Sequence, residues 1–320
     1  RRPGGDAQGR GRPAQCSRHP GPGQRRGQGE ARRHRHPAPA DEPRPAQDLH
    51  GRRSDQVGAP GQGSQYPAGV TMERKVMLVT GASRGIGAEI AVGAARSGWR
   101  VGVNYHRSAD AAQDVVRRIR DAGGEAVALQ ADVSRLPEVE RLFRDLDTAL
   151  GRVDALVNNA GVLASFRITE ADEENVANLY GANVFSVYYC AREAVRRMAR
   201  SRGGRGGVIV NMSSVAARLG GLAGGSAYAG SKGALDAFNL ALAKEVGSEG
   251  IRVNALRPGL IATEIHNVHG GLAQMENLAR TAVPLGRSGS AAEVAHAVLW
   301  LASDAASYVH GAVLDVAGGR

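Results

Sequence analysis

The chain has 320 residues, a formal net charge of +10 and two cysteines, Cys16 and Cys190. No apolar run reaches the roughly 18 residues that a membrane-spanning helix needs, and two separate cysteines provide neither a disulfide framework nor a metal cluster. Composition therefore argues against a membrane protein and against a disulfide-rich secreted domain, and a cytoplasmic location is expected.

The first 71 residues differ in composition from the rest of the chain. They hold 10 of the 13 prolines, 13 arginines against 6 acidic residues, and +7 of the net charge of +10. Leu49, Val57 and Val70 are their only Leu, Ile or Val residues, so this segment cannot bury enough apolar surface to offset its chain entropy. Residues 1–71 are therefore expected to be a disordered tail, either inert or translated from sequence ahead of a start at Met72.

An arginine-rich arm can also bind nucleic acid, so a nucleic-acid-binding protein is one alternative function. Tyr66 is the only aromatic residue in residues 1–71, however, and a platform for stacking single-stranded bases needs several. The segment also lacks the apolar core of a secretory signal. Nucleic acid is therefore not the expected partner.

From Lys75 onward, short apolar runs alternate with segments of helical periodicity. Strands are expected at 76–79, 100–104, 126–130, 153–157, 208–211, 251–256 and 312–316. Helices are expected at about 86–97, 109–122, 136–150, 170–200, 228–250 and 291–303. This alternation predicts an α/β fold for residues 72–320, a single Rossmann-type doubly wound parallel sheet of seven strands with helices on both faces.

A glycine-rich loop joins the first expected strand to the first expected helix. Its glycines are Gly81, Gly85 and Gly87 in the sequence Thr-Gly-Ala-Ser-Arg-Gly-Ile-Gly. Glycine permits a tight turn and a close approach of the backbone to a pyrophosphate, and the helix N-terminus that follows favours negative charge. The position of the loop between strand and helix therefore predicts a nucleotide-binding site.

Tyr228 and Lys232 are four residues apart, which places them on one face of the helix expected there. A phenol normally keeps its proton until about pH 10, and a cation one turn away favours the phenolate. The pair is therefore predicted to exchange a proton with a substrate hydroxyl or carbonyl group near neutral pH.

The glycine spacing Gly-x-x-x-Gly-x-Gly resembles that of the short-chain dehydrogenase/reductase family, and the resemblance extends over residues 72–320. Further motifs occur in the family's order: Asn158-Asn159-Ala160-Gly161, Ser213-Ser214, Tyr228 with Lys232, Arg257-Pro258-Gly259 and Asp315-Val316-Ala317-Gly318-Gly319. The last third of the chain resembles bacterial members described as sugar (glucose) dehydrogenases or as uncharacterised.

The resemblance implies roles for four catalytic residues. Tyr228 would be the acid/base, and Lys232 would lower the pKa of the phenol and bind the nicotinamide ribose. Ser214, preferred over Ser213, would bind the reacting oxygen. Asn183, within the apolar sequence Gly-Ala-Asn-Val-Phe, would hold a water in a proton relay. Ser231 and Cys190 are interpreted as packing residues.

The expected cofactor is NADP(H), with NAD(H) as the alternative. The second strand is followed by no acidic residue before Asp110, whereas Arg84 and Arg107 could bind a 2′-phosphate. The resemblance implies a cofactor site that also includes Gly81, Ser83, Gly85, Ile86, Gly87, Tyr105, Asp132, Val133, Asn158, Ala160, Gly161, Tyr228, Lys232, Pro258, Gly259, Ile261 and Thr263.

Substrate recognition is expected in residues 263–285, where His266 and His269 lack a third ligand and so do not predict a metal site. The leading hypothesis is an oxidoreductase that interconverts a carbonyl and a secondary alcohol. The alternatives are a 3-oxoacyl-(acyl-carrier-protein) reductase and a nucleotide-binding protein without catalysis. The resemblance also implies a homotetramer or homodimer, formed through the apolar faces of 185–190 and 235–246.

Overall fold

A computed structural model describes residues 74–263 and 271–320. The predicted disorder of residues 1–71, the boundary at residue 72, and the features predicted at His266 and His269 all lie outside the described residues. The side chains of Gly271 and Leu272 are likewise outside the description.

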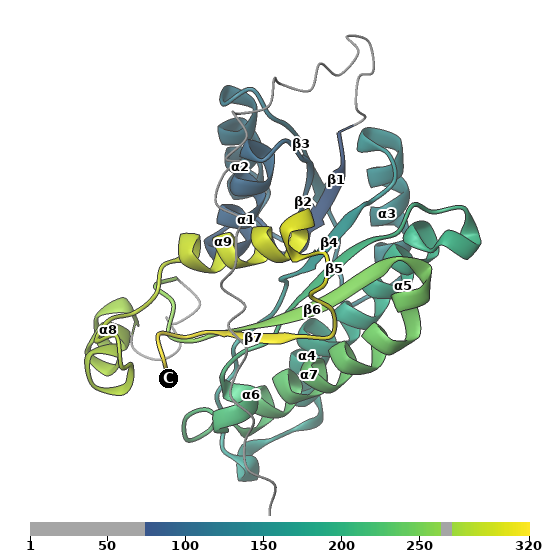
Figure 1. Ribbon diagram of the computed structural model, residues 1–320. Helices are drawn as coiled ribbons and strands as arrows, with labels where there is room; N and C mark the ends of the chain where they lie inside the picture. Colours follow the sequence, from purple (N-terminus) through teal and green to yellow (C-terminus); the bar gives the residue numbers. More distant parts are fainter. Residues whose placement is uncertain (1–73, 264–270) are drawn as a thin grey trace, which may run out of the picture. The chain divides into compact units, whose positions relative to one another are not determined.

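The described residues form a seven-stranded parallel sheet, which confirms the predicted fold class (Figure 1). The strand order is β3-β2-β1-β4-β5-β6-β7, and every neighbouring pair is parallel. The strands are β1 (Val76–Val79), β2 (Arg100–Tyr105), β3 (Glu125–Gln130), β4 (Ala155–Asn158), β5 (Gly207–Met212), β6 (Ile251–Pro258) and β7 (Val313–Val316).

Helices cover both faces of the sheet (Figure 1). The α-helices are α1 (Gly85–Arg96), α2 (Ala109–Asp121), α3 (Leu136–Leu150), α4 (Glu173–Tyr180), α5 (Ser186–Met198), α6 (Ala216–Leu219), α7 (Ser226–Val246), α8 (Gly271–Ala282) and α9 (Ala291–Ala302). Short 3₁₀ turns lie at η1 (Ile168–Glu170), η3 (Arg200–Arg202), η4 (Gly247–Glu249) and η6 (Asp304–Ala306), and a π-helical turn lies at η2 (Gly181–Phe185).

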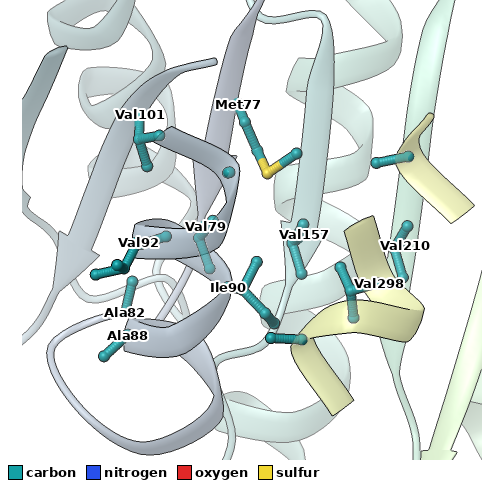
Figure 2. Packing of buried hydrophobic residues seen from close by; sticks show 14 of the residues in the cluster. Met77, Val79, Ala82, Ala88, Ile90, Val92, Val101, Val157, Val210 and Val298 are labelled. Atoms are coloured by element: carbon teal, nitrogen blue, oxygen red, sulfur yellow. The ribbon is translucent and has the colours of Figure 1, made fainter. Parts of the chain in front are cut away.

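Strand β1 separates two apolar cores. Met77 and Val79 point to the face covered by α1, α2 and α9, where they pack with Ile90 and Val298 (Figure 2). Alternate side chains of β1, such as Leu78, point to the other face, which α3, α5 and α7 cover. This period of two explains why every residue of the strand is buried and why the sequence reads as a continuous apolar run.

The crossover of the chain defines where a ligand can bind. From β1 the chain proceeds outward to β2 and β3 and then returns to β4, which pairs with the other side of β1. In open sheets of this kind, the crevice beyond the carboxyl ends of the strands at this reversal is the ligand site. The glycine loop after β1 and the Asn158–Gly161 segment after β4 both lie there.

The structure corrects the single helix predicted over 170–200. The helical region begins after Asp172, whose side chain accepts a hydrogen bond from the Asn175 amide at 2.7 Å and caps α4. It is then divided into α4 and α5 by the π-helical turn η2, which contains Asn183. Sequence periodicity also did not identify the four residues of α6 or the helix α8 within the predicted substrate region.

Candidate active site

A cavity of about 190 Å³ lies beyond the carboxyl ends of β4, β5 and β6. Its walls contain four of the residues predicted to act on a substrate or nicotinamide: Ser214, Tyr228, Lys232 and Gly161. The strands bring these residues together from segments that are distant in the sequence. The cavity is therefore the candidate active site.

Ser214 and Tyr228 both line the cavity wall, and the Ser214 hydroxyl interacts with the phenol. Ser214 follows β5 and Tyr228 lies in the first turn of α7, so the two hydroxyl groups meet where the helix crosses the end of the strand. Burial raises the pKa of Tyr228, and the hydrogen bond to Ser214 offsets part of that rise. The phenol is therefore protonated at neutral pH.

Lys232 is 5% exposed, and its Nζ donates a hydrogen bond to the carbonyl oxygen of Met212 at 2.8 Å. Its Nζ lies 5.9 Å from the centroid of the Tyr228 ring. Burial lowers the pKa of Lys232 to about 8, although the negative charge of Asp236 opposes the change. Burial and Ser214 account for the shift of the Tyr228 pKa, so the role of Lys232 in lowering that pKa stays a prediction.

The two adjacent serines have different surroundings. Ser213 is 4% exposed, and its hydroxyl donates to the carbonyl oxygen of Lys232 at 3.1 Å. The Ser214 hydroxyl accepts a hydrogen bond from the Ala216 amide at 3.1 Å in addition to its contact with Tyr228. Only Ser214 therefore has its hydroxyl beside the phenol, while Ser213 fixes α7 to the end of β5.

Asn183 is completely buried in the π-helical turn η2. Its Oδ1 accepts from the Val162 amide at 2.7 Å, and its Nδ2 donates to the Val162 carbonyl oxygen at 3.0 Å and to Ser231 Oγ at 3.1 Å. Ser231 Oγ in turn donates to the Tyr228 carbonyl oxygen at 2.7 Å. Asn183 thus connects the segment after β4 with the catalytic helix, and Ser231 is more than a packing residue.

The glycine loop forms a cradle that side chains would fill. Gly81 has φ of 60°, and a Cβ at this position would lie 2.9 Å from Ala160 Cα. A Cβ on Gly87 would lie 2.5 Å from Asn159 Nδ2. No side chain caps the N-terminus of α1, so its first amides are open to an anion. These observations fit the pyrophosphate of a dinucleotide.

Three polar residues that sequence reasoning did not single out hold this loop in place. Asn104 Oδ1 accepts from the Gly81 amide at 3.2 Å, and Asn159 Nδ2 donates to the Gly81 carbonyl oxygen at 3.0 Å. Thr80 Oγ1 accepts from the amides of Asn159 and Ala160, both at 3.0 Å. The sequence does show a polar residue at the end of each of these strands. It does not show the hydrogen-bond partners of these residues, because those partners are distant in the sequence.

The two arginines predicted to bind the 2′-phosphate lie in different segments, Arg84 in the glycine loop and Arg107 after β2. The Arg84 guanidinium donates a hydrogen bond to Ser108 Oγ, across the space between the loop and the segment after β2. Arg107 is exposed in the same segment, and no acidic residue stands at the end of β2. His106 Nε2 lies 3.9 Å from Asp132 Oδ2 at the end of β3. The Arg84 guanidinium therefore reaches the segment after β2, where the adenine ribose is expected.

The other predicted cofactor residues occupy different positions around the crevice. Ile261 is 4% exposed. Thr263 lies over the glycine loop, because a Cβ added to Gly85 would be 3.6 Å from Thr263 Cγ2. Asn158 does not line the cavity: it is 1% exposed and its Nδ2 donates to Asn211 Oδ1 at 2.9 Å, which joins β4 to β5. Ser83 lines a second hollow beside α1. The cavity wall contains Ile86, Pro258 and Gly259. The apolar cores include or contact Tyr105, Val133 and Ala160.

Two further properties concern only the described part of the chain. Among those residues, no group of three or more His, Cys, Asp or Glu side chains could hold a metal ion. None of the helices there combines the length and the apolar character needed to cross a membrane.

Comparison with known proteins identifies the family. A family model described as "Enoyl-(Acyl carrier protein) reductase" matches residues 81–320. A solved short-chain dehydrogenase from Burkholderia cenocepacia J2315, in complex with NADP, superposes with a TM-score of 0.71 and 32% identity over 77% of this chain and 97% of that one. The chain belongs to the short-chain dehydrogenase/reductase family. It is therefore an oxidoreductase of a family that binds nicotinamide cofactors.

Two curated members of the family illustrate the range of similar proteins. The uncharacterized oxidoreductase YgfF of Escherichia coli (strain K12) is 45% identical over 246 residues, 77% of this chain and 99% of the relative. The 3-oxoacyl-[acyl-carrier-protein] reductase FabG of Staphylococcus epidermidis is 35% identical over 245 residues, 77% of this chain and 98% of the relative. The similarity therefore covers nearly the whole length of these relatives.

Proposed function

We propose that this short-chain dehydrogenase/reductase is NADP(H)-dependent and interconverts a carbonyl compound and a secondary alcohol, with Tyr228 as the acid/base. One observation carries the proposal: Ser214 and Tyr228 both line a cavity that also contains the buried amine of Lys232, and the Ser214 hydroxyl interacts with the phenol. Two neutral donors side by side suit a carbonyl oxygen on which negative charge develops.

In the reduction direction, Tyr228 donates its phenolic proton to the carbonyl oxygen, and the Ser214 hydroxyl hydrogen-bonds the same oxygen. A bound nicotinamide supplies the hydride to the carbonyl carbon. The raised pKa of Tyr228 keeps the phenol protonated at neutral pH, which suits reduction. Oxidation of an alcohol needs the phenolate as base, so its rate is expected to increase at alkaline pH.

Lys232 and Asn183 support this site in different ways. The Lys232 amine lies close to Gly161, because a Cβ added to this glycine would be 3.5 Å from Nζ. The segment after β4 therefore runs beside the cation. This position supports a role for the ammonium as a donor to ribose hydroxyl groups. Asn183 orients both Val162 and Ser231 and thereby fixes the distance between that segment and the helix of Tyr228.

The preference for NADP(H) over NAD(H) rests on Arg84 and Arg107. The Arg84 guanidinium reaches the segment after β2, where the adenine ribose is expected. A guanidinium can make bidentate, charge-assisted hydrogen bonds to a 2′-phosphate. The Burkholderia relative named as a complex with NADP supports the same choice.

A second candidate function is reduction of a 3-oxoacyl group on an acyl carrier protein, which the Staphylococcus relative supports. It involves the same chemistry at Tyr228 and differs in the partner. Purified acyl carrier protein carrying an acetoacetyl group distinguishes the two. A kcat/KM higher than for free ketones by several orders of magnitude would favour the carrier-protein substrate.

An oligomer is part of the proposal, while the cytoplasmic location stays a prediction. Phe185 and Tyr188, at η2 and on α5, and Leu240 on α7 are exposed, and the Tyr188 and Phe238 rings lie 4.2 Å apart. An apolar surface of this kind could pair with a second copy of the chain. Sedimentation of the purified protein tests for a dimer or a tetramer.

The central experiment measures NADPH oxidation and NADP reduction against a panel of ketones, aldehydes and secondary alcohols. Tyr228→Phe, which removes only the hydroxyl group, is compared with the wild type on the best substrate. General acid catalysis predicts a loss of about 10²- to 10⁴-fold in kcat. Equal turnover by the two proteins would disprove the role of Tyr228.

A further inference from the structure

The cavity beside Tyr228 is lined mainly by apolar side chains. These include Val162, Leu163, Met212, Leu219, Leu222 and Leu260. Val162, Leu219 and Leu222 are 44%, 45% and 46% exposed, so they form an apolar rim rather than a closed core. A substrate with a hydrocarbon body fits such a lining.

Two charged side chains interrupt this apolar lining, Lys232 and Arg320, and no acidic side chain does so among the described residues. Lys232 is already explained by its hydrogen bond to Met212 and its position beside Tyr228. Arg320 has no such explanation. Within residues 74–263 and 271–320, its guanidinium makes no hydrogen bond and no ion pair.

The backbone of Arg320 is nevertheless firmly held. Gly318 and Gly319 have φ of 63° and 93°, and the Arg320 amide donates to the Ala317 carbonyl oxygen at 3.3 Å, so the chain turns back after β7. Arg218 Nη2 donates to the Arg320 carbonyl oxygen at 2.8 Å. The cation is therefore positioned beside the cavity by its main chain while its side chain keeps its hydrogen-bonding capacity.

A row of charged groups connects this turn to the catalytic helix. Arg218 also lies 3.3 Å from Asp315, and Arg257 Nη1 donates to the same carboxylate at 3.3 Å. Arg257 Nε donates to Asp236 on α7 at 3.0 Å. Since Asp236 is one turn beyond Lys232, the position of Arg320 is tied through these pairs to the helix that carries Tyr228.

We propose that Arg320 determines substrate specificity by binding a carboxylate, so that the substrates are ketones with an apolar body and a carboxylate group. The proposal rests on the proposed function, because it assumes that the reacting carbonyl is placed at Tyr228. A guanidinium binds a carboxylate through two parallel hydrogen bonds. A phosphate dianion fits less well, since Arg320 is the one cation of the lining that has no hydrogen bond or ion pair among the described residues.

The test uses matched pairs of substrates that differ only in charge. Straight-chain methyl ketones with a terminal carboxylate, in chains of six, eight and ten carbons, are compared with their methyl esters in the NADPH assay. The variants are Arg320→Gln, which removes the charge, and Arg320→Lys. Arg117→Gln, at an exposed arginine on α2, is the matched control.

The wild type is expected to prefer the carboxylate over the ester by about 10- to 100-fold in kcat/KM for at least one chain length, mainly through KM. Arg320→Gln removes this preference, Arg320→Lys keeps part of it, and Arg117→Gln keeps all of it. The ester kcat/KM stays unchanged in all three variants. An acid-to-ester ratio that is the same in wild type and Arg320→Gln overturns the proposal.

Calorimetry of the same acids and esters separates this proposal from the proposed function. Reduction of the esters with an unaltered acid-to-ester ratio in Arg320→Gln overturns only the role of Arg320. Binding of the acids that is lost in Arg320→Gln, without turnover of any ketone, supports the carboxylate site and overturns the proposed function. Absence of both turnover and binding in the wild type overturns both.

Discussion

The amine of Lys232 faces the end of β5 rather than the hydroxyl oxygen of Tyr228. Its Nζ donates to the Met212 carbonyl oxygen at 2.8 Å and lies 5.9 Å from the centroid of the Tyr228 ring. The cation is thus enclosed beside the phenol without pairing with it. Burial can therefore shift both pKa values away from the charged forms, up for Tyr228 and down for Lys232.

The enclosed amine of Lys232 makes stability depend on pH. Its folded-state pKa of about 8 lies below the ordinary 10.5, so the unfolded chain binds more protons between these values. The destabilisation is complete below pH 8 and disappears as pH approaches 10.5. Lys232→Met removes the buried charge but also loses the hydrogen bond to Met212, and the second effect offsets part of the first. The variant is therefore expected to be more stable than the wild type by about 2 kcal/mol at pH 7.

Urea unfolding at pH 7, 8, 9 and 10 measures this difference for Lys232→Met. Lys244→Met, at an exposed lysine of the same helix, is the control for replacing a lysine of α7 by methionine. The difference for Lys232→Met should narrow as pH rises from 8. A less stable Lys232→Met protein at pH 7 would contradict the pKa assigned to the buried amine.

Ser213 and Ser214 allow the catalytic and structural serines to be separated. Ser214→Ala removes a donor from the reacting oxygen and is expected to lower kcat by about 100-fold with little change in stability. Ser213→Ala removes the hydrogen bond to the Lys232 carbonyl oxygen and is expected to lower stability by about 1 kcal/mol while kcat stays near that of the wild type. Steady-state kinetics and urea unfolding of both variants check this, and the reverse pattern would assign the catalytic role to Ser213.

The features that the sequence predicts correctly depend on local patterns. The apolar runs of β1 and β5 are short and buried on both faces, so their composition alone marks them as strands. The glycine loop is likewise local, because Gly81 and Gly85 need positive φ whatever surrounds them. The sheet and the nucleotide cradle could therefore be predicted before any tertiary contact was known.

The features that sequence reasoning missed depend on contacts between distant residues. Asn183 interrupts a helix whose periodicity is unbroken, because its amide binds Val162, 21 residues earlier. In the sequence Asn104 is one more residue of a strand, and only its contact with Gly81 shows that it holds the glycine loop. Arg320 follows a glycine pair at which nothing local indicates a cavity, and only the pairing of β7 with β6 brings this turn to the cavity that Tyr228 also lines.

Asn183 is expected to matter more for stability than Ser231, its hydrogen-bond partner. Asn183→Ala removes three hydrogen bonds of a completely buried side chain, two to Val162 and one to Ser231, which should lower the free energy of unfolding by about 2–4 kcal/mol. Ser231→Ala removes one hydroxyl group and should lower it by about 1 kcal/mol. Urea unfolding of both variants measures this, and equal losses would show that the contacts with Val162 carry no special weight.

Arg84 is expected to select the phosphorylated cofactor. Arg84→Ala removes the guanidinium beside Ser108 and should weaken NADPH binding by about 10- to 100-fold while the affinity for NADH changes little. Arg141→Ala, at an exposed arginine of α3, is the control for loss of one positive charge. Fluorescence titration with both nucleotides measures the two affinities. A parallel loss for NADPH and NADH would contradict a role in recognising the 2′-phosphate.

Gly87 and Gly233 both lie in helices, but an added methyl group meets different surroundings. At Gly87 a Cβ would lie 2.5 Å from Asn159 Nδ2 and 2.6 Å from the Gly81 carbonyl oxygen, so Gly87→Ala should displace the cradle and lower stability by about 2 kcal/mol. At Gly233 nothing lies within 4 Å, so Gly233→Ala should raise stability by about 0.5–1 kcal/mol through helix propensity. Thermal unfolding with and without NADPH measures both effects. Stabilisation by NADPH should be reduced only in Gly87→Ala, because only this glycine borders the expected pyrophosphate site, and an equal NADPH response of both variants would place the nucleotide elsewhere.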